Sequence, residues 1–336
     1  MIKVAMIGFG GIANTAHFPP YKKLEEDGLA QFVAVCDTDE ARFKGKTTIN
    51  IGASDEGLER SFATYTDWRE MLTHETVDMV DVCLPTFLHA EVVSAVLSMG
   101  YPVLSEKPMA STYADCRKML DAAKKSGQQL MIGQCLRFSN NYNFLKKAIT
   151  ENTFGKLRTA IFRRFSAPPR WGWQNWYMDI EKSGGALQDL HIHDVDMVRY
   201  LLGEPLAVSC DTTDIYSGDD IAYSCMYYKD ATVLAIGDWS REGCNFQADF
   251  TVSFEKATVV LGKDGITVYP RGGSAYKADV EGNDFYEAEI RYFVQLLKNG
   301  CENTENPPES AAATIKLIET LRKSARSGGE KIPFTV

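Results

Sequence analysis

The feature that most constrains the fold of this chain is a glycine-rich turn close to its first residue. An apolar run at 2–7 (IKVAMI) leads directly into a segment with the spacing G-x-G-x-x-A. The segment consists of Gly8, Phe9, Gly10, Gly11, Ile12 and Ala13. Gly8 permits a tight turn, Gly10 lets a pyrophosphate approach the backbone, and Ala13 lets the following helix pack on the strand. The pattern predicts that these six residues bind the phosphates of a dinucleotide.

Asp37 follows the second apolar run of the chain, 32–36, and lies 24 residues past Ala13. This spacing is close to the ~20 residues typical of the acid that binds the ribose hydroxyls of NAD. A carboxylate there disfavours the 2′-phosphate of NADP, because two like charges about 4 Å apart repel by roughly 4 kcal/mol at an effective dielectric constant of ~20. We therefore expect NAD as the cofactor. The alternative role of Asp37 is to cap the next helical segment, which Asp39 would do equally well.

Short apolar runs alternate with helical patterns over the first third of the chain. The runs are 3–7, 32–36, 79–84, 103–105 and 130–132, and they are apolar on both faces. Parallel strands that are covered by helices on both sides have this composition. Repeated strand–helix–strand units of this kind predict an α/β fold with a doubly wound parallel sheet of the Rossmann type over residues 1–125.

The pattern changes near residues 125–135, where we place the domain boundary. A helix is expected from about 186 to 202, and a later helix has an apolar face at 286, 290, 293 and 297. Between them lie six strand-like runs, at 207–214, 221–228, 232–239, 246–254, 257–261 and 266–269. Gly, Asp and Lys punctuate these runs, which is typical of an antiparallel meander. We therefore expect residues 126–336 to form an α+β domain.

Composition excludes several classes of protein. The net charge is −9 and no Lys/Arg cluster stands out, which argues against nucleic acid and anionic lipid as partners. No stretch approaches the ~18 consecutive apolar residues of a membrane span. The eight cysteines are dispersed without a CxxC pair, which favours reduced thiols in a cytoplasmic protein over disulfides or zinc. The first residues lack a basic segment, so we expect no secretory leader.

A Glu106-Lys107-Pro108 tripeptide follows the run 103–105. Ligands of a doubly wound sheet bind outside the carboxyl ends of its strands, so Lys107 is expected to project toward the nicotinamide end of the cleft. A lysine there donates hydrogen bonds to a substrate oxygen. Taken alone, the tripeptide is better explained as a surface lysine before a proline that starts a helix. The peptide bond before Pro108, like any bond that precedes a proline, can adopt the cis or the trans form.

Four motifs occur in one order along the chain: GFGGIA at 8–13, PTFLH at 85–89, GYPVLSEKP at 100–108, and GGALQD at 184–189 with His193. Together they resemble the glucose–fructose oxidoreductase/inositol dehydrogenase/rhizopine catabolism (Gfo/Idh/MocA) family over nearly the whole chain. The resemblance implies a C-terminal domain with a large open sheet that binds substrate and forms the oligomer. It also implies nicotinamide-linked oxidation or reduction of a sugar, polyol or related hydroxy compound, in a homodimer or homotetramer.

In such enzymes the residues that match Lys107, Asp189 and His193 form the catalytic group. The residue types suit the reaction, because a neutral imidazole accepts the hydroxyl proton as hydride leaves carbon. Asp189 and His193 lie four residues apart on the predicted helix, so they share a face. We assign His193 as general base, Lys107 as donor to the substrate and neighbour of the cofactor, and Asp189 as substrate ligand or orienter of the histidine. A lone histidine on a helix would otherwise be a structural residue.

Further candidates follow other strands. Pro85, Thr86, His89 and Glu106 match positions beside the cofactor cleft, although a loop and a first helical turn explain the first three equally well. Gln134 and Arg137 follow the run 130–132 and are candidate substrate ligands, and a surface salt bridge explains Arg137 equally well.

Aromatic residues crowd the segment 171–177, which contains Trp171, Trp173, Trp176 and Tyr177. Flat rings cover the C–H faces of sugars, so Trp173 and Trp176 are candidate substrate contacts. Packing beneath a long loop or a subunit contact explains them equally well.

His191 departs from the family resemblance, which implies a smaller residue there, and we expect it to narrow the substrate pocket. A metal site could be suspected from His191, His193, Asp194 and Asp196. These four residues do not share one helix face, so we expect no metal.

The chain is thus predicted to be a cytoplasmic NAD-dependent dehydrogenase of a sugar, inositol-like polyol or derivative. The alternatives are an NAD-dependent glycoside hydrolase of the same family and a non-catalytic NAD-binding regulator.

Overall fold

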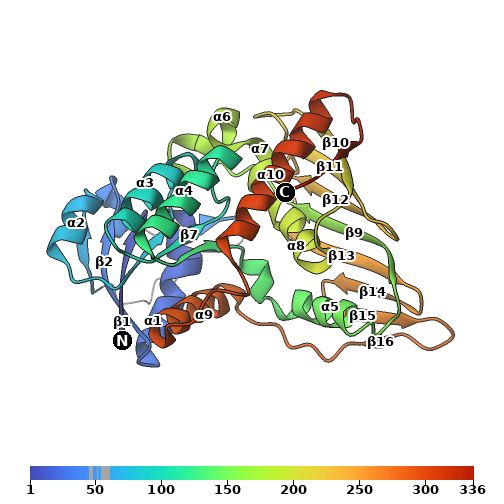
Figure 1. Ribbon diagram of the computed structural model, residues 1–336, viewed down its shortest axis with the longest axis horizontal. Helices are drawn as coiled ribbons and strands as arrows, with labels where there is room; N and C mark the ends of the chain where they lie inside the picture. The colour runs from blue at the N-terminus through green and yellow to red at the C-terminus, as the bar shows by residue number, and fades with distance from the viewer. Residues whose placement is uncertain (45–47, 51, 54–60) are drawn as a thin grey trace. The chain divides into compact units, whose positions relative to one another are not determined.

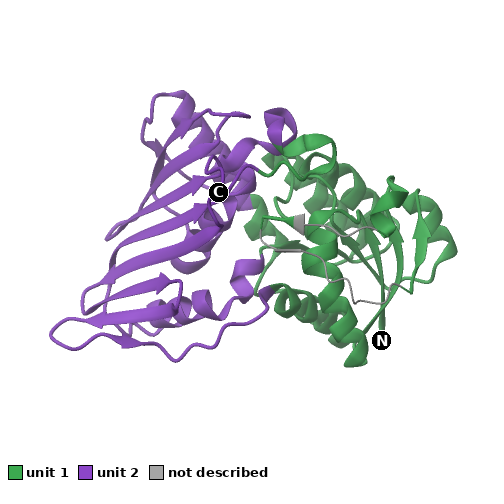
Figure 2. Cartoon of the chain, turned by 180° about the vertical axis from the view of Figure 1, so that it is seen from behind, with its two compact units in different colours: residues 1–134, 169–177, 286–312 green, residues 135–168, 178–285, 313–336 purple. Residues whose placement is uncertain are grey.

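The computed structural model describes residues 1–44, 48–50, 52–53 and 61–336. The chain forms two compact units (Figure 2). Unit 1 contains residues 1–134, 169–177 and 286–312, and unit 2 contains residues 135–168, 178–285 and 313–336. The chain first leaves unit 1 after Gln134. Two later segments return to unit 1, an arrangement that a single boundary does not provide.

Unit 1 contains a six-stranded parallel sheet with the order β5-β2-β1-β6-β7-β8 (Figure 1). The strands are β1 (Ile2–Ile7), β2 (Ala30–Cys36), β5 (Ala63–Tyr65), β6 (Met79–Val82), β7 (Val103–Glu106) and β8 (Leu130–Gly133). The strand order reverses between β1 and β6, which is the position where a doubly wound sheet binds its ligand. The expected Rossmann fold is confirmed. β5 was missed because it is short and only partly buried.

The helices of unit 1 are α1 (Phe18–Glu26), α2 (Trp68–His74), α3 (Thr86–Ser98), α4 (Tyr113–Ser126) and α9 (Phe285–Asn299). Two short strands, β3 (Thr48–Ile49) and β4 (Gly52–Ala53), pair with each other. The apolar faces of α1 and α9 share one core with Val4 and Met6 of β1. The apolar face expected at 286, 290, 293 and 297 therefore packs in unit 1, through Ile290 and Phe293.

The glycine-rich turn leads into a π-helical turn, η1 (Ala13–His17), before α1 begins. Pro19 and Pro20 have no N–H to donate to the carbonyls of Thr15 and Ala16, so a regular α-helix does not run through this point. The two prolines instead occupy the first turn of α1, where a missing donor costs nothing.

Unit 2 contains a nine-stranded sheet with the order β16-β15-β14-β13-β9-β12-β11-β10-β17. The strands are β9 (Leu157–Phe165), β10 (Ala207–Thr213), β11 (Ile221–Tyr227), β12 (Thr232–Asp238), β13 (Gln247–Phe254), β14 (Ala257–Gly262), β15 (Gly265–Pro270), β16 (Tyr276–Lys277) and β17 (Ile332–Pro333). Only β9 and β12 pair in parallel among these described strands. The expected large, mostly antiparallel sheet is confirmed.

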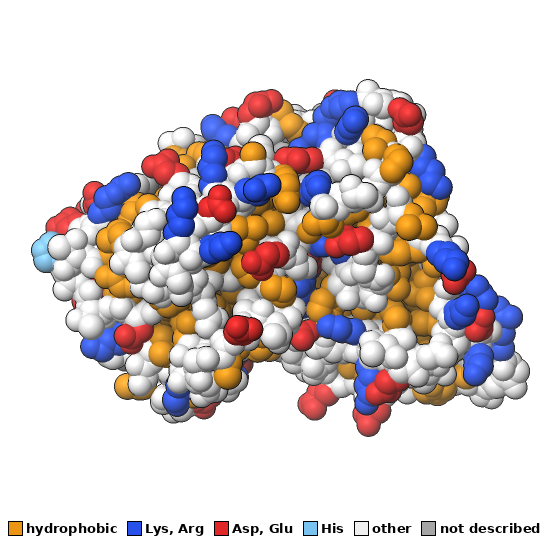
Figure 3. Space-filling model, in the orientation of Figure 1, with side chains coloured by type: hydrophobic (Ala, Val, Ile, Leu, Met, Phe, Trp, Pro, Cys, Tyr) orange, Lys and Arg blue, Asp and Glu red, His pale blue; other side chains and the backbone are white. Residues whose placement is uncertain are grey.

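Helices lie over one face of this sheet (Figures 1 and 2). They are α5 (Asn140–Thr150), α7 (Gly185–Asp189), α8 (Ile192–Leu202) and α10 (Pro308–Arg326), which starts in unit 1. The short helix α6 (Ile180–Ser183) directly precedes α7. Within the described residues no helix combines the length and the apolar character that crossing a membrane requires. On the face shown in Figure 3, basic and acidic side chains are interspersed rather than gathered by sign.

The prediction of a single helix from 186 to 202 is wrong in one respect. The helix is divided into α7 and α8 by a turn at Leu190 and His191. The N–H groups of both turn residues donate to the carbonyl of Ala186, at 3.0 and 2.8 Å. The second bond spans five residues instead of four, so the helix widens there and a new helix starts.

Candidate active site

The turn after β1 can be built only with glycine at its first position. Gly8 has φ +91°, and a Cβ there would lie 2.6 Å from the carbonyl oxygen of Cys83. The Gly8 N–H donates to the Cys36 carbonyl at 2.8 Å, which fixes the turn at the carboxyl ends of β1 and β2. A Cβ at Gly10 would meet nothing within 4 Å, so this part of the backbone is open to a ligand.

A cavity of about 280 Å³ lies beside this turn, within unit 1. It holds a molecule much larger than water. Eight of the residues predicted for cofactor or substrate contact line it: Gly8, Gly10, Gly11, Ile12, Asp37, Pro85, Trp173 and Trp176. Phe9 and Ala13 instead lie in the hydrophobic core beneath the turn.

Asp37 lies on the cavity wall with its carboxylate directed at the glycine-rich turn. One oxygen accepts the Phe9 N–H at 2.8 Å, and the other accepts the Asp39 N–H at 2.9 Å. Asp39 itself caps the following turn, η2 (Glu40–Phe43), by accepting the Ala41 N–H at 3.1 Å. The capping role that was the alternative for Asp37 is thus filled by Asp39, and the Asp37 charge faces the ligand space.

The aromatic segment 169–177 forms the other wall of the cavity. Trp171 covers Gly11 so closely that a Cβ on this glycine would lie 2.8 Å from the indole ring. The rings of Trp176 and Tyr177 stack at 4.0 Å, and Trp176 also meets Phe87 at 6.3 Å. Trp171 therefore packs against the glycine-rich turn of unit 1.

Trp171 also provides a test of whether a cofactor fits here. Its indole Nε1 is buried and has no hydrogen-bond acceptor among the described residues. A buried donor without a partner costs about 1–3 kcal/mol, so the site is completed by a ligand that offers an acceptor. A dinucleotide carries phosphate and ribose oxygens, and the residues present therefore fit NAD. This donor was not predictable from the residue pattern, because its burial depends on a contact between distant segments.

Lys107 follows β7 in unit 1 and is half-buried. The Lys107–Pro108 peptide bond is cis. Glu106 is buried and accepts the Lys107 N–H through Oε2 at 2.9 Å. His89 is fully buried, and its ring nitrogens lie 2.8 Å from the carbonyls of Pro108 and Leu84. Of the candidates described for this part of the cleft, Pro85 lines the cavity. Four others do not line it: Thr86, His89, Glu106 and Lys107.

Asp189 and His193 belong to unit 2, at the end of α7 and the start of α8. Asp189 is buried and His193 is half-buried. The turn at Leu190 and His191 separates them, so they do not lie on one regular helix as expected.

His191 is fully buried beneath β11 and β12. Its Nε2 lies 2.8 Å from the Ser224 hydroxyl, and a Cβ on Gly237 would come within 2.8 Å of it. Burial lowers the pKa of His191 to about 3, and the charge of Arg164 acts in the same direction. The ring is therefore a neutral group of the core, and Gly237 leaves room for it because it carries no side chain.

Two buried ion pairs involve an arginine, and one of these arginines is the candidate substrate ligand Arg137. Arg137 binds Asp196 through two bonds of 2.9 and 2.8 Å, and Arg164 binds Asp194 at 2.9 and 3.1 Å. The salt bridge foreseen for Arg137 is present, although it is buried rather than on the surface. Gln134 is also buried, and its Nε2 has no acceptor within the described part of the chain.

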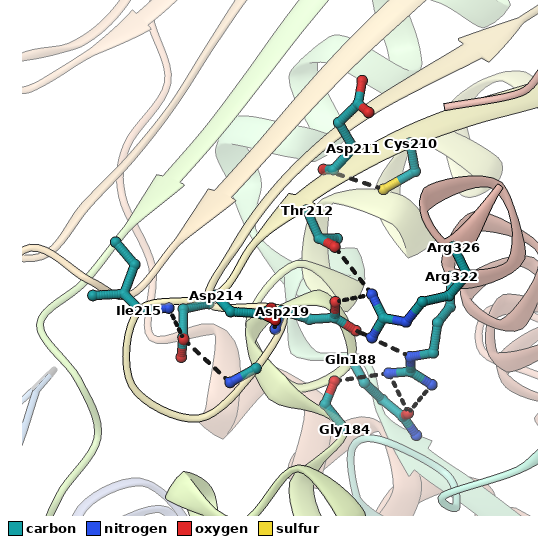
Figure 4. Close-up of polar contacts among 12 residues, drawn as sticks. Gly184, Gln188, Cys210, Asp211, Thr212, Asp214, Ile215, Asp219, Arg322 and Arg326 are labelled. Atoms are coloured by element: carbon teal, nitrogen blue, oxygen red, sulfur yellow. Dashed lines mark hydrogen bonds and ion pairs between the residues drawn. The ribbon is translucent and has the colours of Figure 1, made fainter. Parts of the chain in front are cut away.

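α7, which carries Asp189, is held by arginines of α10 (Figure 4). Arg322 donates to the Gly184 carbonyl at 2.7 Å and to the Gln188 side-chain oxygen at 3.2 Å. Asp219, which has no exposed surface, binds Arg322 at 3.3 Å and Arg326 at 2.8 Å. These contacts fix the amino-terminal end of α7 and thereby the position of Asp189.

Replacing Arg322 with methionine is expected to lower the free energy of unfolding by about 1–3 kcal/mol, because the buried Asp219 carboxylate and the Gly184 carbonyl lose donors. Urea unfolding measures the change. Arg271→Met is the matched control, since Arg271 is exposed. Equal effects of the two substitutions would contradict the role given to Arg322.

Residues 2–134 match a family described as an oxidoreductase family with an NAD-binding Rossmann fold, GFO/IDH/MocA. Residues 142–261 match the GFO/IDH/MocA C-terminal domain. The chain is 32% identical to myo-inositol 2-dehydrogenase of Thermotoga maritima, over 98% of this chain and 97% of that protein. It is 34% identical to inositol 2-dehydrogenase of Rhizobium meliloti, over 74% of this chain and 79% of that protein.

A solved structure has the same fold. The WlbA dehydrogenase from Bordetella pertussis, in complex with NADH and UDP-GlcNAcA, aligns with a TM-score of 0.83 and 22% identity. The alignment covers 100% of this chain and 99% of that chain.

Proposed function

The chain belongs to the Gfo/Idh/MocA family of NAD-binding oxidoreductases, and we propose that it transfers a hydride between NAD and a sugar, an inositol-like polyol or a derivative of these. The observation that carries the proposal is the cavity of unit 1, which is lined by the glycine-rich turn, the Asp37 carboxylate and Trp171. The indole N–H of Trp171 has no acceptor among the described residues. The relatives named as inositol dehydrogenases support the polyol class.

Bound NAD supplies the acceptor for a hydride, which carries two electrons away from the substrate carbon. We assign removal of the hydroxyl proton to His193, so that the alcohol loses one hydride and one proton and becomes a carbonyl. Lys107 donates a hydrogen bond to the reacting oxygen, and Asp189 binds a substrate hydroxyl or orients His193. The buried Glu106 side chain holds the lysine backbone in place by accepting its N–H.

A screen of NADH formation tests the proposal. The protein is incubated with NAD and, separately, with myo-inositol, other polyols, aldoses, sugar acids and aminosugars. We expect NADH to accumulate with at least one of them. Release of an aglycone from glycosides without net NADH would favour a glycoside hydrolase instead. Binding of NAD without turnover of any compound would favour a regulator.

We further propose that the protein is a cytoplasmic homodimer or homotetramer that associates through the uncovered face of the unit 2 sheet. Ile161, Tyr223 and Tyr269 lie on this face, because the strand registers place them on the same side. They are 37%, 47% and 50% exposed. Exposed apolar patches of this kind mark protein interfaces.

Ile161→Lys, at the centre of this face, is expected to shift the protein toward monomer, because a desolvated ammonium opposes association. Light scattering coupled to gel filtration measures the mass. Ser240→Lys, outside the sheet, is the control that keeps the native mass. A monomeric wild type, or an unchanged mass of Ile161→Lys, would refute this interface.

A further inference from the structure

His17 is buried in unit 1 between two carboxylates. It ends the π-helical turn η1 and is 1% exposed. Its Nδ1 lies 2.8 Å from Asp81 Oδ2, and its Nε2 lies 2.9 Å from Glu106 Oε1. Asp81 lies inside the buried strand β6, and Glu106 is the last residue of β7. His17 has no assigned role in the proposed hydride transfer.

The geometry favours a positively charged ring. A carboxylate only accepts hydrogen bonds, so both ring nitrogens must donate, and only an imidazolium does this. Burial alone would lower the pKa of His17, but the Asp81 carboxylate raises it well above its ordinary value. Burial alone would raise the pKa of Glu106, but His17 and Lys107 hold it below its ordinary value.

Other groups around the ring complete the network. The Tyr21 hydroxyl of α1 donates to Asp81 at 2.8 Å, and the Cys83 thiol lies 3.6 Å from the same carboxylate. From α9 the ring of Tyr286 approaches His17 at 6.2 Å between centroids, and the charge of Glu289 acts on Tyr21. Asp81 is therefore anchored on one side of the imidazolium and Glu106 is held on the other.

We propose that His17 is a positioning residue for Lys107, acting through Glu106. One Glu106 oxygen is held by the imidazolium, and the other accepts the Lys107 N–H at 2.9 Å. The proposal rests on the role that the proposed function gives to Lys107.

A metal is the competing explanation, since His17, Asp81 and Cys83 offer ligand atoms within 4.8 Å of one another. A ligand histidine must present a free lone pair to the metal. Here both nitrogens already face carboxylate oxygens at hydrogen-bond distance, and burial raises the pKa of the Cys83 thiol, so that it stays protonated. The arrangement therefore favours an imidazolium.

The first test needs no variant and no turnover. In protein labelled with ¹⁵N-histidine at pH 8, we expect both ring nitrogens of one histidine to remain protonated, and this signal to be absent from His17→Gln. A neutral His17 ring, or a transition metal that co-purifies in stoichiometric amount and is lost in His17→Gln, would overturn the proposal.

The second test follows the link from His17 to Lys107. In protein labelled with ¹⁵N-lysine, Lys107→Arg identifies the Lys107 amide signal. We expect this amide proton to shift upfield in His17→Gln, because the Glu106 acceptor is no longer held, and to stay in place in the control His74→Gln, where an exposed histidine of α2 is changed. An unmoved Lys107 signal in His17→Gln would overturn the link.

The third test separates positioning from general stability. His17→Gln is expected to lower kcat/KM for the substrate by about 10²-fold, the loss typical of a misplaced catalytic group, with an unchanged Kd for NAD. In a Lys107→Met background the same substitution should have no further effect. An equal loss in both backgrounds would show that His17 acts independently of Lys107.

A wild type without turnover would count against the proposed function, while the two NMR tests would still decide the role of His17.

Discussion

Replacing His193 with alanine is expected to lower kcat by about 10²–10⁴-fold, the contribution typical of a positioned general base. The hydroxyl proton of the substrate then has no acceptor when the hydride leaves. The measurement is steady-state NADH formation at saturating NAD and substrate. NAD affinity should stay unchanged, because the cavity that we assign to NAD is lined by residues of unit 1 and His193 belongs to unit 2.

His74→Ala is the matched control for this substitution. His74 is an exposed histidine at the end of α2, and its replacement should leave kcat as it is. A His193→Ala protein that turns over at the native rate would remove His193 from the mechanism. A parallel loss of NAD affinity would instead indicate damage to the fold.

Replacing Asp37 with serine is expected to shift the cofactor preference toward NADP by about 10²–10³-fold, measured as the ratio of kcat/KM for the two cofactors. The estimate follows from removing a repulsion of roughly 4 kcal/mol between the carboxylate and a 2′-phosphate. Arg42, which pairs with Asp39 at 3.5 Å, also lines the cavity, and its guanidinium can bind the phosphate once the Asp37 carboxylate no longer repels it.

Two further variants sharpen this experiment. Asp39→Ser removes a neighbouring carboxylate that caps η2, and it should keep the preference for NAD. Asp37→Ser combined with Arg42→Ala should lose most of the gain with NADP. If Asp37→Ser still prefers NAD as strongly as the native protein, the ribose is bound elsewhere.

The cofactor-binding turn was predictable because its signal is local. The strand, the glycine-rich turn and the start of the helix lie within about a dozen residues. Gly8 and Asp37 both line the cavity. The apolar runs likewise predicted the parallel strands, since burial on both faces leaves few polar positions.

Contacts between distant segments were not predictable in this way. The spacing of the tryptophans does not reveal that Trp171 covers the glycine-rich turn, since Gly11 lies 160 residues away. The division of the helix after Asp189 depends on the burial of His191 against β11 and β12. The only local signal for the His17 network was an aspartate, Asp81, inside an otherwise apolar strand.

The central claim is that Lys107, Asp189 and His193 act together on a substrate next to bound NAD. A crystal structure with NAD and a substrate found in the screen tests it most directly. We predict that the Lys107 ammonium and the His193 ring both lie about 2.6–3.2 Å from the reacting oxygen, as hydrogen-bonded catalytic groups do. A structure in which the two side chains face different cavities, or in which the nicotinamide lies away from both, would contradict the claim.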